Sequence, residues 1–366
     1  MSGLTQSFLP EPAVFVVRDT YHIMVYMETP SLMWVQVGDE KYYDDSNGVL
    51  RSNSLVHRMI VPMDKLNEAK EYILCRRMLV ERKTGYSETG EVEEKTFSFR
   101  PVCCDNVRAY HIADSHNWVE GPVKAAQAFG AFDFLILNGD IPDHGAEMKN
   151  YATIYEIAFL LTKGEIPIVF ARGNHDMRGT YADGFADFSP TDNGKSYYTF
   201  RLGNIWGMIL DCGEDKADEH PENGNVFCCH AFRQRQIQFI KDVIRQADTE
   251  YLASDVVHKV VICHAPFTVQ GRGQFDIEND IYNEWVKLLR EYVKPDVIMN
   301  GHEHRVRIIR PGEEMDHRNQ PCPVVVGSLI QWYQENFGGA GFEFDGNGIQ
   351  VTFTDMYNNV LSCERL

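Results

Sequence analysis

The sequence predicts an all-β sandwich followed by an α/β domain in which central β-sheets are flanked by helices. In the first hundred residues, short apolar runs follow one another with turn signals between them, a pattern typical of a sandwich. Beyond that point, apolar runs alternate with amphipathic helical patterns, which indicates βαβ units. The length of 366 residues also favours two domains over one. We expect the sandwich to span residues 1–103 and the α/β domain to span residues 104–366.

The strands of the first region are predicted from alternation and from turns. Every second residue of Tyr21–Met27 is apolar, as expected for a strand with one buried face. Thr29-Pro30 is a turn signal after this run. The spacing within Leu66–Tyr72 resembles the tyrosine corner of a fibronectin type III domain. The expected strands are Val14–Val17, Tyr21–Met27, Met33–Val37, Leu55–Val61, Glu71–Leu79 and Lys95–Phe99.

Five apolar runs of the second region are predicted to be strands buried on both faces, because they are short and rich in β-branched residues. These runs are Val107–Ile112, Phe132–Leu137, Ile166–Phe170, Val256–Ile262 and Val297–Met299. Helical patterns occur at Gly121–Phe129, Tyr151–Leu161 and Ile237–Ile244. In sheets built from βαβ units, ligands bind beyond the carboxyl ends of the strands. A functional site is therefore expected at that edge.

Each of these runs is followed by side chains that can bind metal ions. Asp114 and His116 are two residues apart, so both can bind one ion from an extended backbone. Asp140 can bridge two ions through its two oxygens, and Asn174 offers a neutral amide oxygen. Asp114 or Asn174 alone would more often be a turn or cap residue, and a single histidine would more often be a surface or core residue with its hydrogen bonds satisfied. Five clusters at one sheet edge instead favour a dinuclear metallohydrolase. The clusters are Asp114-Ser115-His116, Gly139-Asp140, Gly173-Asn174-His175-Asp176, His264 and Gly301-His302-Glu303-His304.

Composition limits the partners and the location. The formal net charge of −18, without a run of Lys or Arg, disfavours broad binding to nucleic acid or to anionic membranes. Nine cysteines without a framework spacing favour a reduced, cytoplasmic protein. We see no signal-peptide pattern in Met1–Pro10 and no apolar stretch near the ~20 residues of a membrane span. We therefore expect a small-molecule substrate, no membrane association and, as an open alternative, a homodimer.

The ordered series Asp-x-His, Gly-Asp, Gly-Asn-His-Asp, His and Gly-His-x-His resembles the calcineurin-like metallophosphoesterase superfamily, over about residues 107–355. The strand-rich region in front of it resembles the N-terminal domain of purple acid phosphatases. The resemblance implies two metal ions with a bridging hydroxide. It assigns one ion to Asp114, His116, Asp140 and His304, and the other to Asp140, Asn174, His264 and His302.

One position departs from the purple acid phosphatases, which carry a tyrosine ligand three residues after the bridging aspartate. Here that position is Asp143, and His116 supplies an imidazole that those enzymes lack. We therefore expect a colourless protein. The nitrogen and oxygen ligands suit two divalent or mixed-valence transition metal ions, with Mn, Fe and Zn as candidates.

The reaction that this resemblance implies is hydrolysis of phosphate monoesters by direct attack of the metal-bridging hydroxide. His175 is expected to assist the leaving group or the transition state. Asp176 is expected to orient His175, although an N-cap role is an equal alternative. Arg178 and Arg272 are weaker candidates for phosphate contacts. A phosphodiesterase acting on a cyclic nucleotide or another diester is the alternative enzyme, and a non-catalytic binding module is the alternative from another class.

Overall fold

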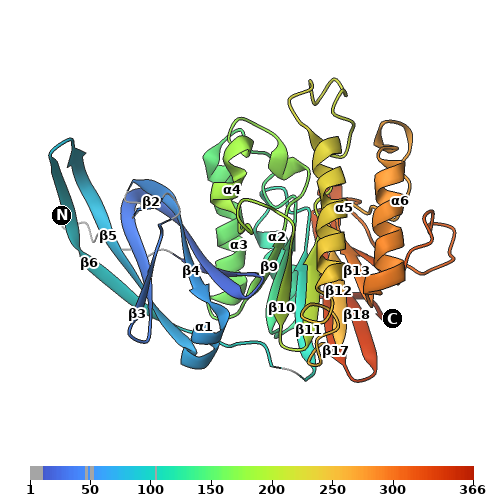
Figure 1. Ribbon diagram of the computed structural model, residues 1–366, viewed down its shortest axis with the longest axis horizontal. Helices are drawn as coiled ribbons and strands as arrows, with labels where there is room; N and C mark the ends of the chain where they lie inside the picture. The colour runs from blue at the N-terminus through green and yellow to red at the C-terminus, as the bar shows by residue number, and fades with distance from the viewer. Residues whose placement is uncertain (1–10, 46–47, 50–52, 104) are drawn as a thin grey trace.

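The computed structural model describes residues 11–45, 48–49, 53–103 and 105–366. A strand-rich N-terminal region, which ends in the long β5–β6 hairpin, lies beside a larger α/β region (Figure 1). No helix in the described part of the chain is long and apolar enough to cross a lipid bilayer. The α/β region agrees with the predicted fold class.

Two β-sheets form the centre of the α/β region. In the first sheet, β7, β8 and β9 are parallel neighbours, and β17, β18 and β19 continue it as antiparallel strands. In the second sheet, β11, β12, β13 and β15 are parallel, with β10 and β14 as antiparallel edges. The strands are β7 Val107–Ile112, β8 Phe134–Asn138, β9 Ile168–Ala171, β10 Tyr198–Leu202, β11 Ile205–Ile209, β12 His258–Ile262, β13 Val297–Asn300, β14 Val306–Ile309, β15 Val324–Gly327, β16 Leu329–Gln331, β17 Asn336–Asp345, β18 Gly348–Asp355 and β19 Val360–Arg365.

The parallel strands are buried on both faces, which explains why they are mostly apolar. Along β8, Ile136 belongs to the core between the two sheets, whereas Leu135 and Leu137 belong to the core beneath the helices of the first sheet. Along β12, Val260 and Ile262 face the shared core, and Val261 faces the other helical layer. Side chains that alternate between two cores leave few polar positions within the strands. His111 of β7 is an exception, and it is buried 2.9 Å from the Asn138 side chain. The polar clusters of the site follow the strand ends.

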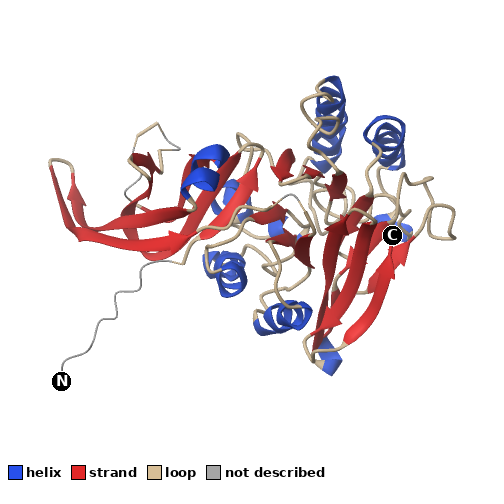
Figure 2. Cartoon of the chain, turned by 90° about the horizontal axis from the view of Figure 1, so that it is seen from below, coloured by secondary structure: helices blue, strands red, loops and turns tan. Residues whose placement is uncertain are grey.

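Helices cover the outer faces of the two sheets (Figure 2). α2 and α3 contribute to the apolar core on the outer face of the first sheet, and α5 and α6 contribute to that of the second. The predicted helical patterns at 121–129, 151–161 and 237–244 are confirmed within α2, α3 and α5, respectively. The helices are α1 Met63–Ala69, α2 Glu120–Phe129, α3 Ala152–Thr162, α4 Phe185–Phe188, α5 Cys229–Arg245 and α6 Asn279–Leu288.

The N-terminal region is rich in strands, as predicted, but two predicted strands are one. β2 runs through the expected turn at Thr29-Pro30. Its first half pairs with β1 and β4, its second half pairs with β3 and β5, and its register with β4 shifts between Tyr26 and Ser31. Pro30 falls within this irregular segment, where a strand tolerates the missing backbone donor. The strands are β1 Ala13–Val17, β2 Thr20–Val37, β3 Glu40–Tyr43, β4 Ser54–Pro62, β5 Glu71–Lys83 and β6 Tyr86–Ser98.

Backbone pairing joins the N-terminal region to the α/β region. β1 pairs in parallel with β9 and antiparallel with β2, so the first sheet continues across both regions. The Tyr72 hydroxyl donates to the carbonyl of Gly164, at the end of α3, over 2.8 Å. This bond corrects the tyrosine-corner prediction, since a tyrosine corner bonds to backbone a few residues upstream. Tyr72 instead ties the two regions together.

Candidate active site

The polar clusters lie together because they follow the carboxyl ends of neighbouring strands. Asp114 follows β7, Asp140 follows β8, and Asn174 follows β9; in the second sheet, His264 follows β12 and His302 follows β13. Five of the seven predicted ligands have a left-handed backbone, with φ between 45° and 71°. Non-glycine residues in that region carry local strain of order 1–3 kcal/mol each, and such residues are concentrated at functional sites. The residues concerned are Asp114, His116, Asp140, His302 and His304.

Glycines allow the strand-end loops to approach one another closely. A Cβ on Gly173 would lie 2.1 Å from Asp140 Oδ1, and one on Gly139 would lie 2.5 Å from the Gly173 nitrogen. A Cβ on Gly301 would lie 2.8 Å from Asp114 Oδ2. Any side chain at these positions would displace a predicted ligand. The glycine in each motif is therefore required by the packing of the site.

Asp114, His116 and His304 form the first group of ligand atoms. Their facing atoms lie within 4.8 Å of one another. The Nε2 atoms of His116 and His304 are 3.2 Å apart, and Asp114 Oδ1 lies 3.5 Å from His304 Nε2. The other carboxylate oxygen of Asp114 accepts bonds from the backbone of His302 and from the Ser328 hydroxyl. One oxygen of Asp114 is thus held by the protein while the other faces the imidazoles.

Asp140, His264 and His302 form the second group, and Asn174 lies beside it. His264 Nε2 lies 3.1 Å from Asp140 Oδ2, while its Nδ1 is 2.6 Å from the carbonyl oxygen of Asn138. That carbonyl accepts a bond from Nδ1–H and leaves Nε2 with its lone pair toward the site. The side-chain oxygen of Asn174 is 3.0 Å from His302 Nδ1. All seven predicted ligands therefore meet in one place.

The donor atoms fit a pair of cations. Asp114 Oδ1 is buried without a hydrogen-bond partner among the described residues. Although burial opposes protonation of His264, the carboxylates of Asp140 and Asp114 raise the pKa of this imidazole to about 10. The site therefore has a strong preference for positive charge among these carboxylates. A cation that replaces the proton of His264 would also give Asp114 Oδ1 a partner.

Asp143 stands three residues after Asp140 and orients an imidazole. Asp143 Oδ1 is 3.1 Å from His116 Nδ1, so it accepts the Nδ1–H bond and leaves His116 Nε2 facing the first group. A carboxylate behind a histidine ligand fixes its tautomer and increases its basicity. The structure thus gives Asp143 a positioning role toward His116.

His175 lies near the ligand groups, but both of its ring nitrogens already have partners. Nδ1 is 2.8 Å from the Asp143 carbonyl oxygen, and Nε2 is 2.9 Å from Arg178 Nη1. Asp176 does not orient His175, contrary to our expectation: its Oδ2 accepts from the Gly173 backbone over 2.7 Å. The short helical turn over residues 175–177 directs the Asp176 carboxyl back toward the loop it follows. The orienting partners of His175 are Asp143 and Arg178.

Several residues of the site were not predicted from the sequence. Ser328 bonds to Asp114, and Glu214 binds the Arg178 guanidinium at 2.7 and 2.9 Å. Trp332 is 51% exposed, with its ring centroid 6.1 Å from that of His116. Each is a single residue in a loop or at a strand end, without a repeated spacing that could have marked it.

The sequence of this chain matches the model of a known protein family. The family model for the calcineurin-like phosphoesterases matches residues 107–306, which is more than half of the chain. The chain belongs to the calcineurin-like phosphoesterase family. As a member of this family it is a metal-dependent phosphoester hydrolase, and the family uses a dinuclear metal centre of the kind that the two ligand groups could hold.

A solved structure shows the same fold at low sequence identity. The purple acid phosphatase PPD1 of yellow lupin (Lupinus luteus) is 13% identical, with a TM-score of 0.61; the alignment covers 96% of this chain and 73% of the lupin chain. A dimetal phosphatase from Danio rerio is 10% identical, with a TM-score of 0.46, and covers 70% of this chain and 96% of the other. No curated protein sequence matches the chain significantly. The alignment with PPD1 includes the N-terminal β region of this chain. The two proteins therefore share the arrangement of a β region and an α/β region.

Proposed function

We propose that this protein hydrolyses phosphate monoesters at a dinuclear metal centre. One observation carries the proposal: two groups of ligand side chains meet around Asp140. Each group contains residues that follow strands of both sheets. Asp114, His116, Asp140 and His304 would hold one ion, and Asp140, Asn174, His264 and His302 would hold the other. The nitrogen and oxygen donors suit Mn, Fe or Zn. When bound, two such ions supply an activated water nucleophile and offset the negative charge of the phosphoryl oxygens.

The chain itself supplies the groups around the reacting phosphorus. In our proposal, His175 gives a proton to the leaving oxygen or stabilises charge on the phosphoryl group. Its Nδ1–H bond to Asp143 fixes the ring, so Nε2 is the atom that would act. Arg178 donates to Nε2 in the structure, so Nε2 must leave this bond and take up a proton from solvent before it can give one to the leaving oxygen. Arg178, held by Glu214, keeps a positive charge beside His175. A fixed cation there favours a monoester, whose phosphoryl group carries the higher negative charge.

The monoester assignment can be tested directly against the diester alternative. We expect the metal-loaded protein to hydrolyse para-nitrophenyl phosphate with a higher kcat/KM than bis(para-nitrophenyl) phosphate. Both reactions release the same chromophore, so the comparison depends only on the charge and size of the phosphorus substituent. A clear preference for the bis-ester would assign the site to phosphodiester hydrolysis. Bound metal without turnover of either ester would favour a binding module.

We also propose that residues 1–103 are a fibronectin type III-like support for the catalytic domain, residues 104–366. Two groups of antiparallel strands that share β2 support this reading. The region is firmly attached: β1 pairs with β9, and Arg58 of β4 donates to the carbonyl of Ser189 over 2.6 Å. Apolar residues of both regions belong to one core cluster, for example Val16 and Val169.

Removing residues 1–100 should therefore prevent folding of the catalytic domain. The deletion strips β1 from β9 and exposes the apolar core that the two regions share. We expect an aggregated product without a cooperative melting transition, measured by circular dichroism and size-exclusion chromatography. A soluble fragment with undiminished metal content and turnover would contradict the proposed support role.

A further inference from the structure

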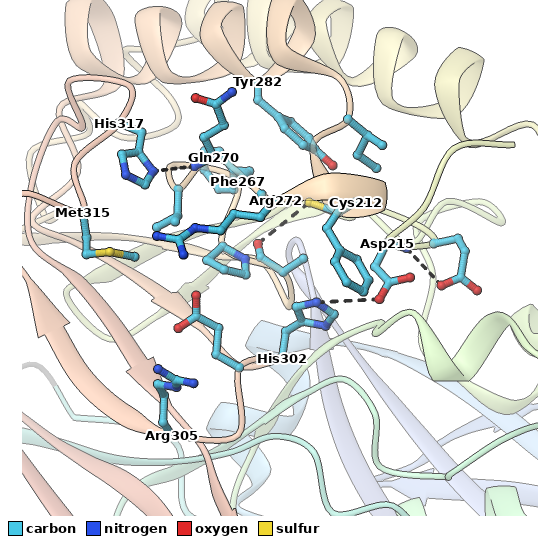
Figure 3. Close-up of a pocket in the computed structure, with 18 of the residues that line it drawn as sticks. Cys212, Asp215, Phe267, Gln270, Arg272, Tyr282, His302, Arg305, Met315 and His317 are labelled. Carbon is cyan, nitrogen blue, oxygen red and sulfur yellow. Dashed lines mark hydrogen bonds and ion pairs between the residues drawn. The ribbon is translucent and has the colours of Figure 1, made fainter. Parts of the chain in front are cut away.

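A second cavity, of about 600 Å³, opens beside the candidate metal centre (Figure 3). It shares Asp215, Phe275 and His302 with the pocket lined by Asp140, Asn174 and His304, so the two spaces adjoin. The loop after β12 and the loop after β13 supply most of its lining. A substrate bound through its phosphoryl group at the metal centre would extend into this cavity with the rest of its structure.

The inner wall of the cavity is largely apolar. Phe267 and Tyr282 are buried, Val269 and Met315 are partly buried, and Phe275 is 42% exposed at the boundary with the metal site. Ligand pockets commonly combine such a wall with a few placed polar groups. This wall fits the ring or hydrocarbon part of an organic leaving group.

Most charged groups of the lining already have partners. Glu214 and Asp215 pair with Arg178, and Asp215 also pairs with Lys216 at 2.8 Å. Glu303 pairs with Arg307. These carboxylates are therefore neutralised locally and do not repel an anion in the cavity.

Two arginines of the lining are different, because each has a free guanidinium. Within the described ranges of the chain, the side chains of Arg272 and Arg305 make no hydrogen bond or ion pair with another residue. In the view of Figure 3 both lie on one side of His302, and Asp215 lies on the other. The protein as a whole carries a formal charge of −18. Two unpaired cations facing one cavity of an acidic protein concentrate positive potential there.

We propose that this cavity holds the leaving group of the substrate and that Arg272 and Arg305 bind a second anionic group on it. The inference rests on the proposed function and narrows it to a substrate class: organic phosphates whose alcohol portion has an apolar or ring-shaped body and carries a further carboxylate or phosphate. Guanidinium groups suit both anions, because their N–H donors match the paired oxygens.

A pair of synthetic esters that differ only in the second charge tests the proposal. We would compare 4-carboxyphenyl phosphate with 4-carbamoylphenyl phosphate, and repeat the comparison with biphenyl bodies to vary the reach. The wild-type kcat/KM should be higher for the carboxylate ester than for the carboxamide ester in the phenyl pair, the biphenyl pair or both. The double variant Arg272→Gln/Arg305→Gln should lower this ratio by about tenfold or more, as expected for the loss of charge-assisted hydrogen bonds.

Arg235→Gln is the matched control, because Arg235 is an exposed arginine on α5 that does not line the cavity. It should leave the carboxylate-to-carboxamide ratio unchanged. A ratio near one in the wild type, or a ratio that survives in the double variant, would overturn the proposal while leaving phosphatase activity established.

Binding of non-hydrolysable analogues tests the anion site separately from the proposed phosphatase activity. Calorimetric titration with 4-carboxybenzylphosphonate and 4-carbamoylbenzylphosphonate measures the same charge preference without turnover. If neither ester is hydrolysed by metal-loaded protein, the proposed function fails. An arginine-dependent preference for the carboxylate phosphonate would then still support the anion site, and its absence would refute that site as well.

Discussion

Asp140→Asn should remove both metal ions and turnover together. Asp140 Oδ2 lies 3.1 Å from His264 Nε2, and its Oδ1 accepts the His175 backbone N–H over 2.8 Å, so the carboxylate stands at the junction of the two ligand groups. A neutral amide of the same shape offers one oxygen and no charge, and it cannot offset the repulsion between two cations held close together. We expect metal content to fall from about two ions per chain to less than one, with kcat falling by at least ~10³-fold, as expected for loss of the metals that activate water.

Asp211→Asn is the control for this prediction. Asp211 also follows a strand of the same edge, but its Oδ2 pairs with Arg172 at 2.7 Å and with the Ser196 hydroxyl at 2.6 Å. The variant should retain two metal ions, measured by inductively coupled plasma mass spectrometry on protein that melts cooperatively. If Asp140→Asn kept both ions, Asp140 could not be the shared ligand.

His175→Ala should keep both metals and slow turnover by about 10²-fold or more, in the range of general acid–base contributions. His175 has a ligand atom within 4.8 Å of those of His116 and Asp140, but its Nδ1 is bonded to the Asp143 carbonyl and its Nε2 to Arg178, so we expect it not to bind the ions. The loss should be larger for an alkyl phosphate, whose leaving alkoxide needs a proton, than for para-nitrophenyl phosphate. Loss of metal from this variant would instead make His175 a ligand.

His144→Ala supplies the comparison for His175. His144 is a neighbouring histidine that belongs to neither ligand group: its Nδ1 accepts from the Ala146 backbone, and its Nε2 lies 3.9 Å from Asp143 Oδ2. Its removal should change kcat by less than about twofold, within the small effects typical of surface substitutions. An equal loss in both variants would mean that the decrease reflects loop disturbance and not chemistry at His175.

The catalytic edge could be predicted from sequence because the parallel strands are buried on both faces. Such strands are mostly apolar, so their ends are marked where polar residues gather, as at Asp114-Ser115-His116 and Gly139-Asp140. The order of pairing could not be predicted in the same way. The neighbours of β1 are β2, adjacent in sequence, and β9, about 150 residues later. That long-range pairing leaves no local signal, and neither does the continuation of β2 through Pro30.

The seven predicted ligands were identifiable because they occur in short motifs with fixed spacing. The groups that orient them were harder to predict, because they act across loops. Asp176 is adjacent to His175 in sequence, yet its carboxylate turns to the Gly173 backbone. Asp143, more than thirty residues earlier, provides the carbonyl that fixes the ring. Sequence proximity was a poor guide here because a short helical turn points successive side chains in different directions.

Anomalous diffraction from crystals of the metal-loaded protein tests the central claim most directly. We expect two anomalous peaks, one on each side of Asp140: one contacted by Asp114, His116 and His304, and the other by Asn174, His264 and His302. A single peak, or peaks away from these side chains in protein that hydrolyses phosphate esters, would contradict the proposed dinuclear site.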